Sequence, residues 1–492
     1  MRGPARALVL FLVLAGVPPS LPSGAAWGRT DGGVRGLAST RGRGSLAPPR
    51  ARVPLHAPRT RVQRLRGAGP DAVGPVAAEA GDEGATEAVE AGGSAAAEGE
   101  TMQEGLARFH GTLGGKVFYN RVMVVNRDLS VLVLRWFVGQ HAREMEALHL
   151  RRLERLRNAS LSTNGTNATA PGAEPGAADS GLLDNATAAP ERKVHVLDAM
   201  SATGLRAIRY ALEVPEVGSI TANDKDPDAV EAIRSNVALS QVPDGKVHAV
   251  ESDAVSLMLA RAGAGELFDF IDLDPFGSPA ALLSAALHAL RPGGMLAVTA
   301  TDMRVLCGNQ PEVCFSRYGS MSLRGPYAKE MAIRILLHAI RTAAAPLGRT
   351  VEPVVSVYMD FYVRVFVRVW PNRAGALRTC LHSGNVVHCQ SCHTFSLQPN
   401  AVLTHNRRIS VAYASALSPR GDGSEAGHDR EAGGAGAGAG GACCGVGPFL
   451  FGGPVWLGKL QSPDVVLSLR NALRERSELV GKCVCARSLF VM

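Results

Sequence analysis

From residue 193 onward, short apolar runs alternate with stretches whose apolar residues recur every three or four positions. The first pattern predicts buried β-strands, and the second predicts helices, as in the spacing of Leu205, Ile208 and Leu212. This alternation predicts an α/β fold with a doubly wound parallel sheet, whose ligands bind at the carboxyl ends of the strands. Strands are expected at 194–200, 219–223, 247–251, 268–273 and 294–301, and helices at 204–213, 226–240 and 279–290.

Two further β-rich runs, at 351–358 and 361–370, are predicted to form a hairpin that closes the sheet. The sheet is expected to belong to a domain covering 104–372, followed by a smaller α+β domain at 373–492. Residues 158–190 and 419–441 have low-complexity compositions and are expected to be surface insertions, because loop-closure entropy grows slowly with length. No apolar run beyond the extreme N-terminus reaches about 18 residues, which excludes a polytopic membrane protein.

The N-terminal residues have the composition of targeting segments. Residues 1–26 combine two early arginines, an apolar run and a small-residue end, as secretory signals do. Residues 27–70 are Arg-, Ser- and Pro-rich and nearly free of acids, as transit peptides are. Together they predict a bipartite leader that delivers the protein to an organelle, a plastid first and a mitochondrion second, with secretion as a further alternative. The acidic residues 71–103 are expected to be a disordered linker.

The formal net charge of +8 is distributed unevenly. Residues 1–70 carry 12 bases and one acid, whereas residues 71–105 carry nine acids and no base. Residues 106–157 hold ten bases and four acids. This segment precedes the sheet and is expected either to contact the phosphates of a nucleic acid or to form a solvated helix face over 143–157.

Acidic residues follow three successive predicted strands. The first strand runs into Asp198 and a turn of small residues that ends at Gly204 and lacks the G-x-G-x-x-G pattern of dinucleotide sites. Asp224 ends the second strand, where a carboxylate can bind both ribose hydroxyls, and Asp253 with Ala254 follows the third, where adenine would lie. A single acid at such a position is more often a helix cap. Three in this order instead predict a nucleoside cofactor without phosphates, such as S-adenosylmethionine.

The fourth strand ends in Asp274, Pro275, Phe276 and Gly277. This motif resembles the D-P-P-Y/F motif of amine-directed methyltransferases. A carboxylate that accepts the N–H of an exocyclic amine, with the carbonyl of Pro275 nearby, would raise the electron density on nitrogen and aim it at a methyl donor. Phe276 could stack on a base that has left its own stack. The alternative is a capped strand followed by a β-turn.

Several blocks together resemble one family, the tRNA guanosine-26 N2-methyl/dimethyltransferases, which have a Rossmann-like class I methyltransferase core. The blocks include EG at 104–105, FYN at 118–120, NRDLS at 126–130, LDAMSATGLRAIRYALE at 197–213, FDFIDLDPFGSPA at 268–280, TDMRVLCGN at 301–309 and DFYVRVFVRV at 360–369. One departure is Arg121, where the family usually has proline.

The resemblance implies a role for each matching residue. Arg127 and Arg206 would bind the cofactor together with Asp224, Asp253 and Ala254. Asp274 would be the catalytic carboxylate, Pro275 would help to bind the amine, and Phe118 and Phe276 would sandwich the target guanine. From the residues alone, Phe118 fits a core position better, so its role as a base-stacking residue rests on the resemblance.

The resemblance also implies a zinc site in the C-terminal domain. Cys389 and Cys392 form a C-x-x-C pair, but the second pair of the family is reduced to two adjacent cysteines, of which Cys444 is the candidate ligand. His388 or His393 could substitute for the missing ligand. The sequence after the Gly-Gly-Pro block at 452–454 lacks the aromatic-rich segment of the family, so a reduced tRNA-contacting domain is expected.

These observations predict a tRNA (guanine(26)-N(2))-dimethyltransferase that uses S-adenosylmethionine and has tRNA as its partner. Two alternatives stay open at this point. The chain could methylate another exocyclic amine, on a neighbouring tRNA guanine or a DNA adenine, or it could be a tRNA-binding paralogue without catalysis. The sequence leaves open whether one or two methyl groups are transferred.

Overall fold

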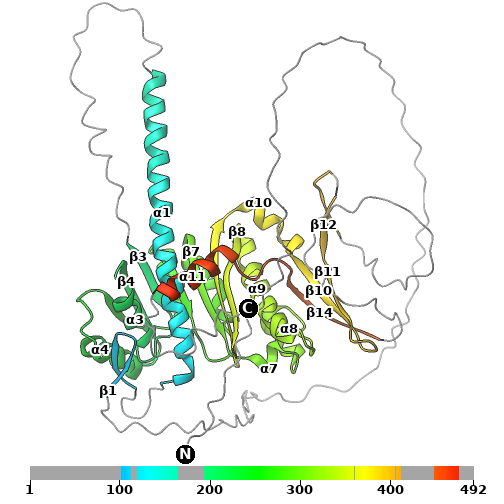
Figure 1. The fold of residues 1–492 in the computed structure, drawn as a ribbon, viewed down its shortest axis with the longest axis horizontal. Coiled ribbons are helices and arrows are strands. Elements are labelled where there is room, and N and C mark those ends of the chain that lie inside the picture. The colour runs from blue at the N-terminus through cyan, green and yellow to red at the C-terminus, as the bar shows by residue number, and fades with distance from the viewer. Residues whose placement is uncertain are drawn as a thin grey trace, which may run out of the picture. The chain divides into compact units, whose positions relative to one another are not determined.

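A seven-stranded mixed sheet dominates the computed structural model, which describes residues 101–111, 119–163, 193–359, 361–404, 406–411 and 448–475 (Figure 1). The strand order is β5-β4-β3-β6-β7-β9-β8, in which β9 runs antiparallel to both of its neighbours. The predicted α/β fold is confirmed, with a closing antiparallel hairpin as expected. The strands are β3 (Val194–Asp198), β4 (Val217–Asp224), β5 (Val247–Glu251), β6 (Phe268–Leu273), β7 (Leu290–Ala300), β8 (Arg349–Met359) and β9 (Tyr362–Pro371).

Helices cover both faces of this sheet, which explains why central strands are apolar on both sides. Every residue of β6 is buried. One face packs on α5 (Ala254–Gly263), α6 (Leu283–Ala289) and α9 (Ala328–Ala344) through core residues such as Ile271 and Val298. The other face packs on α1 (Val124–Thr163), α3 (Leu205–Glu213), α4 (Pro227–Leu239) and α11 (Pro463–Glu475) through core residues such as Phe270 and Phe366.

Several element boundaries differ from the expected ones. The predicted helix at 279–290 begins as a 3₁₀ turn, η2 (Ala280–Leu282), and continues as α6. Helix α1 extends to Thr163 and therefore includes the first six residues of the predicted insertion at 158–190. Strand β1 (Thr101–Glu104) includes the last three residues of the predicted linker and pairs with β2 (Ala107–His110). The predicted leader and the 419–441 insertion lie outside the described residues.

Small antiparallel sheets follow the large one. Strand β10 (Ser383–Cys389) lies between β11 (Phe395–Pro399) and β14 (Phe449–Trp456), and β12 (Ala401–Leu403) pairs with β13 (Ile409–Val411). Val455 and Trp456 of β14 belong to the same core as α9, so β14 packs against the helix that covers the large sheet. The domain boundary at 373 stays a prediction. Among the described helices, none combines the length and the apolarity that crossing a membrane requires.

Shorter elements lie at both edges of the sheet. At the carboxyl edge are η1 (Arg121–Met123), α7 (Met303–Leu306) and α8 (Pro311–Tyr318). At the opposite edge, η3 (Ala345–Leu347) precedes β8, and α10 (Arg373–Leu377) and η4 (Thr379–His382) follow β9. Of these, η1 precedes α1 and α7 follows β7, so both bring chain segments to the edge where β6 ends.

Candidate active site

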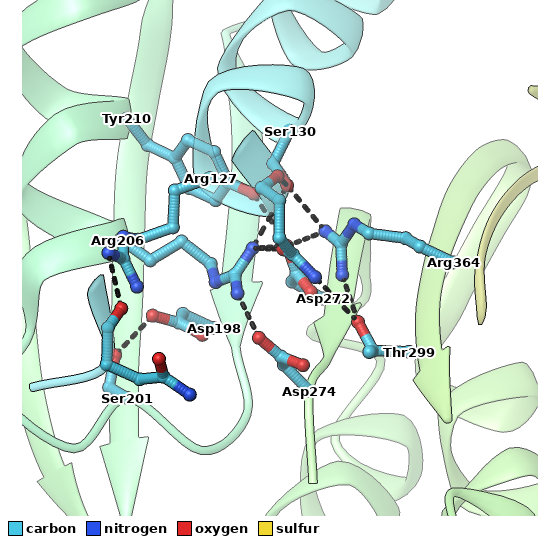
Figure 2. Close-up of polar contacts among 12 residues, drawn as sticks. Arg127, Ser130, Asp198, Ser201, Arg206, Tyr210, Asp272, Asp274, Thr299 and Arg364 are labelled. Atoms are coloured by element: carbon cyan, nitrogen blue, oxygen red, sulfur yellow. Dashed lines mark hydrogen bonds and ion pairs between the residues drawn. The ribbon is translucent and has the colours of Figure 1, made fainter. Parts of the chain in front are cut away.

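Asp274 follows the last residue of β6 and points toward the guanidinium of Arg206, with which it forms an ion pair (Figure 2). Arg206 belongs to the first turn of α3, directly after the small-residue turn that leaves β3. Because β3 and β6 are neighbours in the sheet, their carboxyl ends bring these two residues together although 68 positions separate them in the chain. The structure thus joins the predicted catalytic carboxylate to one of the predicted cofactor-binding arginines.

A second carboxylate, Asp272, lies beneath this pair and is completely buried. Its Oδ2 accepts hydrogen bonds from Arg364 of β9 at 2.7 Å and from the Tyr210 hydroxyl at 2.6 Å, and it lies 3.4 Å from Arg206. Burial by itself would raise the pKa of Asp272, but the two arginines outweigh it and hold that pKa below its usual value. Asp272 is therefore an ionised carboxylate that fixes two buried guanidinium groups.

Side chains of α1 and β7 complete this network on the same face of the sheet. The Ser130 hydroxyl lies 3.0 Å from Arg206 and 2.8 Å from Arg364, whose other nitrogen donates to Thr299 at 2.6 Å. Arg206 also donates to the side-chain oxygen of Asn126 at 2.9 Å. The guanidinium of Arg206 is consequently held from several sides while one of its nitrogens reaches Asp274 at the sheet edge (Figure 2).

Asp198, at the end of β3, is also a buried carboxylate, but its pKa is shifted in the opposite direction from that of Asp272. Burial raises its pKa to about 7, and nearby Asp272 and Asp274 add to that rise, although Arg206 counteracts it. Its Oδ2 accepts a hydrogen bond from the Ser201 hydroxyl. Asp198 is thus partly protonated near neutral pH, whereas Asp272 stays ionised.

The predicted cofactor residues Asp224 and Asp253 lie at the ends of the adjacent strands β4 and β5. The Asp224 carboxylate accepts the backbone N–H of Ala202 at 2.9 Å and so holds the turn after β3 against β4. The Asp253 side chain accepts the N–H of Ser256 at 2.9 Å and caps α5, whose first residue is the buried Ala254. The capping role weighed for these acids is thus real for Asp253.

The buried side-chain amide of Asn223 connects the segments that follow β3 and β5. It donates to the carbonyls of Ala199 and Ser252, both at 3.0 Å, and its Oδ1 is buried without a hydrogen-bond partner among the described residues. The carboxylates at the ends of β4 and β5 can accept hydrogen bonds from a nucleoside. The guanidinium after β3 can pair with the carboxylate of an amino-acid tail. S-adenosylmethionine has both of these parts. The residues present therefore fit S-adenosylmethionine.

The loop after Asp274 presents an aromatic ring to solvent. Phe276 is 91% exposed, and Pro275 next to it is half-buried. Gly277 has a φ of +81°, a left-handed conformation that favours glycine, and exchanges hydrogen bonds with Thr301 after β7. A fully exposed phenylalanine on an anchored loop beside a carboxylate is what a base-stacking residue requires.

Arg127, in contrast, is not joined to the other predicted site residues by any hydrogen bond or ion pair among the described residues. It donates to both oxygens of Glu104, each at 2.6 Å, and to the carbonyl of Asn120 at 3.1 Å. Glu104 also accepts from Arg209 at 2.8 Å. Burial opposes the charge of Glu104, but these arginines hold its pKa below the usual range. Arg127 thus fastens the β1–β2 hairpin to α1 in this structure.

Four other predicted site residues are apart from this site or outside the described residues. Cys389 is buried at the end of β10 and Cys392 is exposed in the turn that follows. Phe118 and Cys444 lie outside the described residues. Within the described parts of the chain, no cluster of three or more His, Cys, Asp or Glu side chains has the arrangement of a metal site.

The sequence-based prediction assigned no role to Asp272, Arg364, Tyr210 or Ser130. One signal was available: Asp272 and Arg364 are charged residues inside mostly apolar strands, and a buried charge in such a strand requires a partner. The sequence could not say that these two residues are each other's partners.

Comparisons with known proteins identify the family of this chain. Residues 103–485 match the model of the family "N2,N2-dimethylguanosine tRNA methyltransferase". The chain is 36% identical over 398 residues to "tRNA (guanine(26)-N(2))-dimethyltransferase 2" of Arabidopsis thaliana, covering 77% of this chain and 64% of that protein. It is 38% identical over 312 residues to the tRNA (guanine(26)-N(2))-dimethyltransferase of Homo sapiens, covering 61% and 46%.

A solved structure, that of Trm1 from Pyrococcus horikoshii with S-adenosyl-L-methionine, is similar with a TM-score of 0.51 and 26% identity. The match covers 76% of this chain and 78% of that one. The chain spans less than two thirds of the length of the Arabidopsis and human relatives. Because the family model matches more than half of the chain, the chain belongs to the N2,N2-dimethylguanosine tRNA methyltransferase family.

Proposed function

We propose that this protein methylates the exocyclic N2 of guanosine 26 in tRNA, with S-adenosylmethionine as the methyl donor. The observation that carries the proposal is the placement of Asp274 at the end of β6, paired with the buried Arg206 and followed by the exposed Phe276. Membership of the family, the names of the relatives, and the S-adenosyl-L-methionine complex of the Pyrococcus protein support it.

Each residue at the sheet edge has a definite task in this reaction. S-adenosylmethionine, when bound, supplies a methyl group on a positively charged sulfur. Arg206 would pair with the carboxylate of its methionine part, since a guanidinium can donate two parallel hydrogen bonds. Asp224 would accept from the ribose hydroxyls, and the end of β5 at Asp253 and Ala254 would border the adenine.

Asp274 would accept an N–H proton of the guanine amine and so increase the availability of the nitrogen lone pair. The carbonyl of Pro275 can accept the second N–H, which orients the amine. Phe276, because it is exposed, can stack on a guanine that has left the RNA stack, an interaction worth about 1–3 kcal/mol per base. The predicted partner in this sandwich, Phe118, lies outside the described residues.

Arg206 would have contacts with both the cofactor carboxylate and Asp274. The ionised Asp272 below it keeps the guanidinium at this position, together with Ser130 and Asn126. Cofactor binding and the orientation of Asp274 are therefore expected to depend on the same arginine.

Nucleoside mass spectrometry of tRNA incubated with the full chain and S-adenosylmethionine tests this function. We expect methylated N2-guanosine from substrate tRNA and none from the same tRNA with adenosine at position 26. Asp274→Asn should lower the rate by about 10²–10⁴-fold, the usual contribution of a positioned proton acceptor. Asp244→Asn, at an exposed acid in the turn before β5, serves as the matched control and should leave the rate unchanged.

Persistent methylation of the adenosine-26 tRNA would show that the protein acts on another exocyclic amine. A wild-type rate for Asp274→Asn would remove that residue from the mechanism. A chain that binds tRNA but has no affinity for S-adenosylmethionine in a calorimetric titration would instead be a tRNA-binding paralogue.

Zinc binding and organelle delivery stay separate predictions. Cys389 and Cys392 would need further ligands, of which Cys444 lies outside the described residues, so elemental analysis of the purified chain is the direct test. A mitochondrial relative exists in Saccharomyces cerevisiae, "tRNA (guanine(26)-N(2))-dimethyltransferase, mitochondrial", at 32% identity. Fluorescence microscopy of a fusion carrying residues 1–103 would distinguish a plastid from a mitochondrion.

A further inference from the structure

A pocket of about 490 Å³ lies at the carboxyl edge of the sheet, the edge at which Asp274 lies. None of the residue roles proposed above involves this pocket. Its volume falls within the range of about 300–1,000 Å³ that is usual for ligand pockets. Its walls come from three segments that are distant in sequence: α7 and the residues after it, the start of α9, and the end of β8. The residues used in the argument are Met303, Arg304, Asn309, Pro326, Lys329 and Tyr358.

Hydrogen bonds connect one wall of the pocket to the loop that follows Asp274. Thr301, two residues before the first pocket residue, donates its backbone N–H to Gly277 and accepts the N–H of Gly277 at its hydroxyl. Across the sheet, Tyr358 pairs with Val363, which pairs with Ala300 at the end of β7. The pocket and Asp274 therefore lie along one edge of the sheet, three strand positions apart, or about 14 Å at the usual strand spacing.

The position of α7 is fixed by Asp302, which precedes this helix. Its carboxylate accepts hydrogen bonds from Arg317 at 3.1 Å and from the Tyr318 hydroxyl at 2.7 Å, both in α8. Hydrogen bonds to α8 and to Gly277 therefore hold the residues that precede α7, and with them this wall of the pocket, in place.

The chemistry of the walls indicates an anion attached to a flat, partly apolar group. Two of the nine lining residues, Arg304 and Lys329, are cationic and exposed, and none is acidic. The Lys329 ammonium lies 4.7 Å from the centre of the Tyr358 ring, a cation–π contact that holds the charge at the pocket. Met303 and Pro326 supply apolar surface, and the Asn309 amide offers both a donor and an acceptor.

A covalent role for this pocket is disfavoured by its one thiol. Burial raises the pKa of Cys307, although nearby Lys329 acts in the other direction, so the thiol stays protonated at neutral pH. The pocket is thus suited to binding and not to nucleophilic chemistry.

We propose that this pocket binds a nucleotide of the tRNA next to the target guanosine. Its phosphate would pair with Arg304 and Lys329, and its base would lie against Met303 and Pro326, with its edge at Asn309. The inference rests on the proposed function, because a guanosine that has left the stack to reach Asp274 leaves its neighbours exposed along the same sheet edge. Two cations on one side of that path would hold the strand in register.

The test is a double variant, Arg304→Gln with Lys329→Gln, studied in the full chain. The matched control is Lys193→Gln with Arg234→Gln, which removes two exposed charges outside the pocket, at the start of β3 and on α4. For the pocket variant we expect tRNA binding at least about tenfold weaker, and S-adenosylmethionine binding unchanged. The slope of log affinity against log salt concentration should fall by about 0.7 for each phosphate of a single strand that the variant no longer neutralises.

A second measurement uses tRNA with an abasic nucleotide on either side of guanosine 26. On the wild-type chain, one of these two substrates should bind more weakly, because its base no longer fills the pocket. That weakening should be absent in an Asn309→Ala, Met303→Ala variant, whose pocket cannot hold the base in either substrate. Equal binding of both abasic substrates by the wild-type chain would overturn the assignment of a base to the pocket.

The two proposals can fail separately. If the wild-type chain transfers no methyl group to tRNA, the proposed function is wrong. If the wild-type chain methylates guanosine 26 and the pocket variant binds tRNA with the affinity and salt slope of the control, only the pocket assignment is wrong.

Discussion

Two buried carboxylates in this protein each lie between two arginines, yet they belong to different parts of the molecule. Glu104 binds Arg127 and Arg209 where the β1–β2 hairpin meets α1 and α3. Asp272 binds Arg364 and lies 3.4 Å from Arg206, near the carboxyl end of β6 that leads to Asp274. Both carboxyl groups have lowered pKa values, since the arginines outweigh the effect of burial.

The difference lies in what the arginines contact next. Arg209 also forms ion pairs with Glu213 and Asp128, each at 2.7 Å, and both of these residues lie on the adjoining helices α3 and α1. Arg206 also forms an ion pair with Asp274, which lies at the carboxyl edge of the sheet, where ligands of α/β proteins bind. A buried ion pair and a shifted pKa therefore do not by themselves mark an active site, and the position relative to the strand ends does.

Removal of the central carboxylate should have the largest effect, and the two clusters should respond unequally. Asp272→Ala leaves Arg206 and Arg364 buried side by side and should lower the free energy of unfolding by about 3–5 kcal/mol. Glu104→Ala should cost less, about 1.5–3 kcal/mol, because Glu104 and Arg127 are slightly exposed, at 7% and 8%, whereas Asp272 and Arg364 are fully buried. Arg209 also keeps two other carboxylates. Urea unfolding at pH 7 measures both, and equal losses would show that the residual partners of Arg209 do not compensate.

Replacement of one arginine in each cluster by lysine should separate binding from stability. Arg206→Lys loses paired hydrogen bonds and should weaken S-adenosylmethionine binding by about 10–100-fold, with a parallel loss of turnover. Arg127→Lys should lower thermal stability and leave cofactor affinity within about threefold of wild type, because its contacts are with Glu104 and Asn120. Calorimetric titration decides between them; a large loss of affinity in Arg127→Lys would restore the cofactor role predicted for it.

The last expected effect, and the smallest for a step of one pH unit, is a difference in pH dependence between Asp198 and Asp272. Because the folded pKa of Asp198 is about 7, the folded chain holds its proton between about pH 4 and 7 while the unfolded chain has lost it. Stability from this group therefore falls as the pH rises through that window, by up to about 1.4 kcal/mol per pH unit. Asp272, with a lowered pKa, contributes stability that is fully present above about pH 4 and is lost only below it.

Asp198→Asn keeps an acceptor for Ser201 and cannot release a proton. Relative to wild type, the variant should thus become progressively more stable from about pH 4.5 to 7 and show a constant difference above about pH 7. Urea unfolding at several pH values across this range provides the measurement. A difference that does not change with pH would mean that Asp198 is ionised throughout.

Local patterns in the chain were sufficient to predict the strands of the sheet, the closing hairpin and the acids at the strand ends. Apolar runs and turn residues are local signals, so β5 and β6 were predicted at the bounds that the structure shows. Parallel strands bring their carboxyl ends to one edge, which is why the sequence alone predicts that Asp224, Asp253 and Asp274 lie at one site.

The pairing of the charged residues, in contrast, depends on how distant segments pack. Ser130 and Arg364 are 234 positions apart, and their contact depends on the packing of α1 across β9. The contact of β1 with α1 joins Arg127 to Glu104, and the pairing of β3 with β6 joins Arg206 to Asp274, although both arginines are equal candidates for cofactor binding in the sequence. A helix of 40 residues also extends about 60 Å, so arginines 143–157 lie about 24–45 Å along α1 from Arg127 and not beside the site. Strand periodicity is local, whereas charge pairing and distance are properties of the folded chain, and for that reason only the fold could settle them.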